Sequence, residues 1–203
     1  MGILILKSFP LVQIGSEETA YGGSQDWFYK KIQRDAGCAS VSAANIAAYY
    51  NIGIRPDRVR GEDRIYVIDT YMKLMEEMYG YMTPGPMGFP NTQKYQYRFL
   101  SFAAEHGRRF RSRELKGWKK EAEALQFIRE ALEENNPVAI LVLTHRAPEM
   151  RDNTWHWMTI SGYDDEKGTL VLSNYGKQET QDAAMLLENH PENRMTLVAF
   201  TEV

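Results

Sequence analysis

The chain has 203 residues, of which 43% are hydrophobic and 12% aromatic, so its length allows one sizeable core and barely two. Charged residues make up 25% and the net charge is −3, which excludes a basic surface for nucleic acid or an anionic membrane. The single cysteine excludes an internal disulfide and a cysteine-cluster zinc site. We expect one domain over residues 1–203, with a helical lobe over about 25–135 and an antiparallel sheet lobe over about 136–203.

The N-terminal segment, residues 1–10, is apolar but lacks the basic start and the continuous apolar run of a signal peptide. It therefore predicts a first strand. No later run reaches the roughly 18 apolar residues of a membrane-spanning helix. We expect a cytoplasmic protein without a membrane partner, although removal of an export signal would leave the same sequence.

Helical periodicity dominates the first two thirds of the chain. A polar, glycine-bearing loop over residues 16–25 precedes a helix that begins at Cys38 and ends at Asn51–Gly53. Further helices are predicted over residues 63–79, 92–106 and 119–135, with a short strand over 110–115. Methionines recur at helical intervals within residues 63–79, and we expect them to fill the core.

The pattern changes after Pro137 to alternating or fully apolar runs, which are typical of strands. These runs predict strands over residues 138–143, 155–163, 169–173 and 194–200, and a short helix over 180–190. Helices that come first and antiparallel strands that follow indicate an α+β fold.

Cys38 stands where a polar turn gives way to an alanine-rich run, so it is predicted to be the first residue of a helix. Unpaired backbone N–H groups and the helix dipole favour an anion there. Such a cysteine can have a pKa lowered from about 8.5 to roughly 3.5–7.5, which makes it a nucleophile near neutral pH. The alternative is a small buried hydrophobe, as most lone cysteines are.

A nucleophilic cysteine needs a base and a group that orients the base. His156 opens an apolar strand between Trp155 and Trp157, and Asn174 ends the strand of the next hairpin. Neighbouring antiparallel strands would bring His156 and Asn174 side by side, where the amide can accept a hydrogen bond from the imidazole. Taken singly, His156 fits a core histidine and Asn174 a turn residue.

Gln33 lies five residues before Cys38. Its side-chain N–H₂ could face a developing oxyanion together with the backbone N–H of Cys38. A polar loop residue is an equal alternative for Gln33.

These motifs resemble those of the papain-like cysteine peptidases, and the layout is most similar to the compact bacterial branch related to double-glycine leader peptidases. The resemblance spans about residues 25–200 and rests on three segments: Gln33 with Gly37-Cys38, residues 156–164, and Asn174-Tyr175-Gly176. The leader-peptidase branch usually has aspartate where Asn174 stands. Papain has Gly-Ser-Cys-Trp where this chain has residues 37–40, Gly-Cys-Ala-Ser.

The resemblance implies a papain-like fold, with a central helix that carries the cysteine and a C-terminal antiparallel sheet that carries the histidine and the amide. It implies a Cys–His–Asn triad that hydrolyses a peptide or small amide through an acyl-enzyme, with an oxyanion donor beside it. The residues in those catalytic roles are Cys38, His156, Asn174 and Gln33. Substrate contacts are expected from Trp155, Trp157, Gly37 and Tyr175, although both tryptophans could equally be buried packing residues.

Two other functions share this constellation. An acyltransferase or amidase would use the same triad, because transferases and peptidases differ in whether an amine or water receives the acyl group. A non-catalytic binding protein could keep the same fold. No His, Asp or Glu pair shows a recognisable metal-ligand spacing, so we expect neither a metal nor another cofactor. The sequence does not indicate an oligomeric state.

Overall fold

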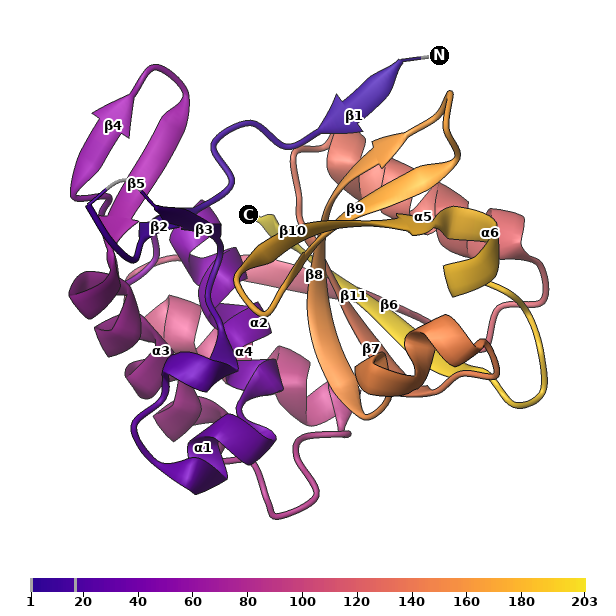
Figure 1. Cartoon of the computed structure of the whole chain (residues 1–203), viewed down its shortest axis with the longest axis horizontal. Coiled ribbons are helices and arrows are strands. Elements are labelled where there is room, and N and C mark those ends of the chain that lie inside the picture. Colours follow the sequence, from indigo (N-terminus) through magenta and orange to yellow (C-terminus); the bar gives the residue numbers. More distant parts are fainter. Residues whose placement is uncertain (1, 17) are drawn as a thin grey trace.

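The strands predicted after Pro137 form the centre of a seven-stranded sheet in the computed structural model, which describes residues 2–16 and 18–203 (Figure 1). Met1 of the predicted first strand and Glu17 of the predicted loop lie outside the described residues. The sheet order is β10-β9-β8-β7-β11-β6, with β1 paired to β8, and every pairing is antiparallel. The strands are β1 (Ile3–Ile5), β6 (Phe110–Lys116), β7 (Val138–Thr144), β8 (His156–Asp164), β9 (Thr169–Asn174), β10 (Lys177–Asp182) and β11 (Arg194–Glu202).

Helix α2 (Cys38–Tyr49) lies in the middle of the molecule and packs against β8 and against the next helix, α3 (Ile68–Met82) (Figure 1). Residues 38–48 are all buried, as expected for a helix that is covered on every side. Its many alanines and serines let neighbouring elements approach its backbone closely. The predicted end is also found, because Asn51 and Gly53 take left-handed φ values of 55° and 70°.

Two helical layers cover the two faces of the sheet (Figure 1). Helices α2, α3 and α4 (Thr92–Glu105) share one core, which includes the buried methionines of α3. Helices α5 (Glu121–Glu133) and α6 (Ala183–Leu186) belong to the core on the other face. The remaining short elements are α1 (Lys31–Ala36), the 3₁₀ turns η1 (Gln25–Trp27) and η2 (Pro148–Asn153), and a second sheet of β2 (Leu11–Gln13), β3 (Thr19–Tyr21), β4 (Arg58–Arg60) and β5 (Asp63–Val67).

Two predicted boundaries are wrong. Residues 63–67 form β5 rather than the first turn of a helix, because they pair in parallel with β2. Residues 180–182 belong to β10, which pairs with β9, so the predicted helix over 180–190 shrinks to α6. In both cases a strand pairing outweighs local helical spacing.

The large sheet combines strands from both sides of residue 135. β6 pairs with β11 as an edge of the large sheet, although about 80 residues separate them in sequence. α5 packs on the face of this sheet that lies away from α2. The α+β class and the antiparallel sheet are as predicted. Within residues 2–16 and 18–203, no helix has the length and apolarity needed to cross a membrane.

Candidate active site

Cys38 is the first residue of α2, and Gly37 before it occupies the N-cap position. The side chain of Cys38 is buried, with 6% of its surface exposed. A side chain at position 37 would collide with the carbonyl oxygen of Gln33 and the ring of Phe28. Gly37 is therefore required by the close packing of α1 against the start of α2, and it does not line the cavity beside Cys38.

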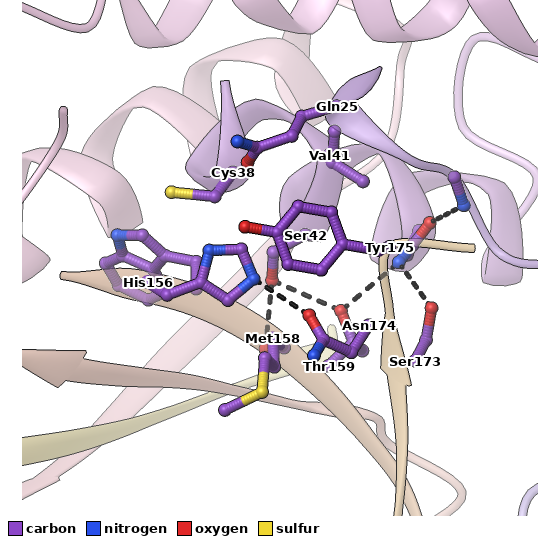
Figure 2. Close-up of a pocket in the computed structure, with 13 residues that line it drawn as sticks. Gln25, Cys38, Val41, Ser42, His156, Met158, Thr159, Ser173, Asn174 and Tyr175 are labelled. Atoms are coloured by element: carbon purple, nitrogen blue, oxygen red, sulfur yellow. Dashed lines mark hydrogen bonds between the residues drawn. The ribbon is translucent and has the colours of Figure 1, made fainter. Parts of the chain in front are cut away.

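His156 and Asn174 meet at the ends of two neighbouring strands, as their places in the sequence predict. The Nε2 atom of His156 lies 2.8 Å from Oδ1 of Asn174, and both side chains are buried. Cys38 and Asn174 lie on opposite sides of the imidazole in Figure 2. The helix start and the two strand ends thus bring a thiol, an imidazole and an amide to one cavity.

Polar contacts from the middle of α2 hold the helix against the sheet. Ser42 Oγ lies 3.2 Å from Thr159 Oγ1 on β8, and Asn45 Nδ2 donates to Ser173 Oγ on β9 at 3.1 Å. Asn45 Oδ1 accepts from the backbone N–H of Gly23 at 2.9 Å. Because Ser173 precedes Asn174 directly, Asn45 connects the helix, the strand of Asn174 and the loop before η1.

The cavity is small. It has a free volume of about 10 Å³, which is the room of about one water molecule. Tyr175 covers His156, with the two rings stacked 4.8 Å apart and 6° from parallel. Its backbone has a left-handed φ of 47°. The lining residues are Gly23, Gln25, Cys38, Val41, Ser42, Asn45, His156, Trp157, Met158, Thr159, Ser173, Asn174 and Tyr175 (Figure 2).

Burial controls the protonation of the two reactive groups. It raises the pKa of the Cys38 thiol above its ordinary value of 9.0, and nearby backbone groups of Trp157, Ala39 and Cys38 oppose this only in part. Burial also lowers the pKa of His156 below 6.5, against the hydrogen bond of Asn174 and the charges of Glu179 and Asp26. The resting pair is thus a neutral thiol and a neutral imidazole. This is opposite in sign to the lowered cysteine pKa expected from the helix start alone.

The two predicted tryptophan contacts differ in their surroundings. Trp157 is buried, stacks on Tyr95 with ring centroids 4.1 Å apart, and donates from Nε1 to the Phe89 carbonyl oxygen at 2.7 Å. It lines the cavity and belongs to the core shared by α2, α3 and α4. Trp155 is 51% exposed with a left-handed φ of 54°, and it is not among the residues that line the cavity.

Gln33 lies outside this cavity. Its side chain is buried in α1, where Nε2 donates to Glu76 at 2.5 Å and Oε1 accepts from the backbone N–H of Lys30. Both ends of the amide are therefore occupied away from Cys38. The helical turn of α1 points residue 33 toward α3, which nearness to Cys38 in sequence does not reveal.

Gln25 takes the place beside Cys38 that the sequence suggested for Gln33 (Figure 2). Its Nε2 donates to the carbonyl oxygen of Arg34 at 2.5 Å, and its Oε1 is buried without a hydrogen-bond partner in the described structure. Gly22 and Gly23 allow the loop before Gln25 to lie close to α2 and α3, because a side chain at either position would come within 3.0 Å of one of these helices. Two glycines directly before a polar turn were the signal for this close approach.

Two residues that the sequence did not predict for the site bind the amide nitrogen of Asn174 and do not line the cavity. Asn174 Nδ2 donates to Asn153 Oδ1 at 3.0 Å and to Glu179 Oε2 at 3.2 Å. Asn153 ends η2, and Glu179 lies on β10 just before the predicted helix over residues 180–190. In the described part of the chain, no group of three or more His, Cys, Asp or Glu side chains is arranged to hold a metal ion.

Comparison with known proteins identifies a family. The model of the Peptidase_C39 like family matches residues 24–190, which include Gln25, Cys38, His156 and Asn174. The match therefore covers most of the chain. No match was found among curated proteins.

Proposed function

Since the chain belongs to the Peptidase_C39 like family, whose fold is papain-like, we propose that it is a cysteine peptidase with Cys38, His156 and Asn174 as its catalytic triad. The observation that carries this proposal is the 2.8 Å hydrogen bond between His156 and Asn174, in a cavity that also holds the only cysteine. The three side chains come from three different elements, and a nucleophile, a base and a group that orients the base at one cavity are the parts that nucleophilic catalysis requires.

In the first half-reaction, Cys38 Sγ attacks the carbonyl carbon of the scissile bond and forms a carbon–sulfur bond. Its proton passes to Nδ1 of His156, which is free to accept because burial keeps the imidazole neutral. The carbonyl electron pair moves to oxygen and returns when the carbon–nitrogen bond breaks. His156 then gives its proton to the leaving amine, and a thioester to Cys38 remains.

In the second half-reaction, water attacks the thioester carbon and transfers a proton to His156. The carbon–sulfur bond breaks, the proton returns to Cys38 and a carboxylic acid leaves. Asn174 keeps the imidazole oriented throughout, because its Oδ1 accepts from Nε2. Neither half-reaction needs a group from outside the chain other than substrate and water.

The oxyanion of each tetrahedral intermediate is stabilised by Gln25 and by the backbone N–H of Cys38. Gln25 Nε2 carries two N–H groups, and one of them donates to Arg34. The second is the donor for the oxyanion. Such a donor acts in a buried cavity, where it typically contributes about 3–4 kcal/mol to the transition state.

The substrate is proposed to enter beside Tyr175. A larger hollow of about 440 Å³ lies there, and Tyr175 borders both this hollow and the catalytic cavity. Trp27, Leu11 and Ile14 give it apolar walls, which suit an apolar side chain of a peptide. Because the catalytic cavity holds about one water molecule, Tyr175 must shift when a peptide carbonyl reaches Cys38.

The test uses iodoacetamide, which needs no knowledge of the natural substrate. Alkylation of Cys38 is followed by mass spectrometry from pH 5 to pH 10 in the natural protein and in His156→Ala. We expect alkylation at pH 7 to be at least about tenfold slower in the variant, because the base that removes the thiol proton is lost. Equal rates in the two proteins would refute the catalytic pair and leave a binding protein of the same fold.

A library of short peptides then tests the reaction itself. Release of free carboxylic acids that is abolished by Cys38→Ala supports hydrolysis. Products that form only when an amine is added, and that contain this amine, would instead support an acyltransferase.

A further inference from the structure

The Asn174 amide contacts a carboxylate through its nitrogen and His156 through its oxygen. Its Nδ2 donates to Glu179 Oε2 at 3.2 Å, while its Oδ1 faces His156 Nε2 at 2.8 Å. Glu179 pairs with Leu172 in the β9–β10 hairpin, so strand alternation places it on the same face as Asn174, two positions along. The contact therefore follows from the register of the hairpin.

The chemistry of this contact determines which way the Asn174 amide faces. An ionised carboxylate can only accept hydrogen bonds, so the group that faces Glu179 must be the N–H₂. The oxygen of the amide is then left for His156. Asn153 Oδ1 accepts the second N–H at 3.0 Å, and both donors of Asn174 are thereby occupied.

The tautomer of His156 follows in turn. Because the Asn174 oxygen can only accept, Nε2 of His156 must carry the proton. Nδ1 is then the unprotonated nitrogen, and it lies on the side of the ring away from Asn174, toward Cys38 (Figure 2). A base must present an unprotonated nitrogen to the thiol. The hydrogen bonds from Glu179 through Asn174 to His156 therefore leave the His156 nitrogen that faces Cys38 free to accept its proton.

Glu179 also brings a negative charge to a triad whose third member is neutral. No Lys or Arg within the described residues forms an ion pair with Glu179 that would cancel this charge. Other acidic groups that act on His156 or on the Tyr175 ring above it are Asp26 of η1 and Asp152 of η2.

We propose that Glu179 is a positioning residue of this site, which orients Asn174 and stabilises the imidazolium of His156 through one intervening hydrogen bond. The inference rests on the proposed function, because it assigns a role within the same triad. A single carboxylate in the place of Asn174 could both orient His156 and supply a negative charge. In this chain Asn174 orients His156 and Glu179 supplies the charge.

Two substitutions separate the two parts of the role. Glu179→Gln retains an oxygen that can accept from Asn174 but removes the charge, whereas Glu179→Ala removes both. Glu133→Gln is the matched control, since it removes one charge from an exposed residue of α5 on the far side of the sheet.

The first readout is the pH dependence of Cys38 alkylation by iodoacetamide. We expect the rate at pH 7 to fall about tenfold in Glu179→Ala and less in Glu179→Gln. In both variants the acidic limb of the profile should move to lower pH, because loss of the negative charge makes His156 easier to deprotonate. Glu133→Gln should match the natural protein.

The second readout is the ring tautomer of His156 in a ¹⁵N-histidine NMR spectrum, assigned with His156→Ala. We expect the Nε2–H form in the natural protein and in Glu179→Gln, and a mixture in Glu179→Ala. A profile and tautomer unchanged in both variants would overturn the proposal. If Glu179→Ala does not fold, an unshifted acidic limb in Glu179→Gln overturns it alone. If Cys38 is alkylated equally fast in the natural protein and in His156→Ala, the proposed function itself is refuted.

Discussion

The two faces of the large sheet are held to their helices by different forces. On the α5 face the buried contacts are apolar, with Ile128, Leu132, Ile140 and Leu197 in one core. The ion pairs of α5, Arg113–Glu130 and Arg129–Asp165, are partly exposed. On the α2 face, apolar contacts are joined by buried hydrogen bonds, of which those of Asn45 are the most extensive. Hydrophobic burial is non-directional and keeps layers together, whereas hydrogen bonds require particular distances and angles. The directional contacts are therefore found on the face where the side chains of the candidate active site must be positioned accurately.

Because the two faces are held differently, we expect substitutions on them to affect stability and activity separately. A substitution on the α5 face should lower the free energy of unfolding without changing the chemistry of Cys38. A substitution on the α2 face should change the rate of Cys38 alkylation, with a smaller loss in the free energy of unfolding.

Removal of the side-chain amide of Gln25 should have the largest effect on rate. Gln25→Ala is expected to lower kcat/KM by about 10²–10³-fold, or about 3–4 kcal/mol, through loss of an oxyanion donor. Gln33→Ala is the matched control, since Gln33 bonds Glu76 and lies outside the cavity. Steady-state kinetics on a peptide found in the library screen measures both. A larger loss in Gln33→Ala would contradict the assignment to Gln25.

The apolar face should give the largest effect on stability. Ile128→Ala removes a fully buried side chain from α5 and is expected to lower the free energy of unfolding by about 3 kcal/mol. Urea unfolding monitored by circular dichroism measures this loss. The alkylation rate of Cys38, taken well below the unfolding midpoint, should remain that of the natural protein. A tenfold change in that rate would show that the two faces are coupled.

The polar face is probed by Asn45→Leu, which keeps side-chain bulk but removes the amide. The backbone N–H of Gly23 and the hydroxyl of Tyr71 would each lose a buried acceptor, at a cost of about 2 kcal/mol together. Because Gly23 leads to Gln25, we also expect slower Cys38 alkylation. Urea unfolding and alkylation are measured on the same samples. A stability loss with an unchanged rate would show that Asn45 holds the fold but not the site.

The smallest expected signal is spectroscopic. Burial raises the pKa of Cys38 above 9.0 and lowers that of His156 below 6.5, so the thiol is protonated between these values. The absorbance near 240 nm of the natural protein minus that of Cys38→Ser should be close to zero at pH 7. It should appear only as the pH rises above 9. A full thiolate signal at pH 7 would contradict the neutral pair.

Much of the fold was predictable from local patterns. The alanine-rich run after Cys38 indicated a buried helix, and the apolar runs after Pro137 indicated a largely buried antiparallel sheet, because side-chain periodicity reflects burial directly. The places of His156 and Asn174 near the ends of two strands joined by a hairpin were enough to predict that they lie close together, although the register of these strands shifts between Ile160 and Gly162.

Other features depended on contacts between distant segments. Residues 63–67 have helical spacing, yet they form β5 because β2 offers a pairing partner. Gln33 is nearer to Cys38 in sequence, yet Gln25 lines the cavity because a loop opened by two glycines folds back along α2. Sequence distance along a chain that turns does not measure distance in space.

Local sequence patterns thus predicted the α+β class and the elements that carry the cysteine, the histidine and the amide. Contacts between distant segments determined which glutamine lies beside Cys38, and that Glu179 contacts the amide nitrogen of Asn174. They also determined the direction of the Cys38 pKa shift, because a helix start favours the thiolate while burial opposes it. The tendency of residues to start a helix depends on their neighbours in sequence, whereas the desolvation of a side chain such as Cys38 depends on all the residues that the fold packs around it.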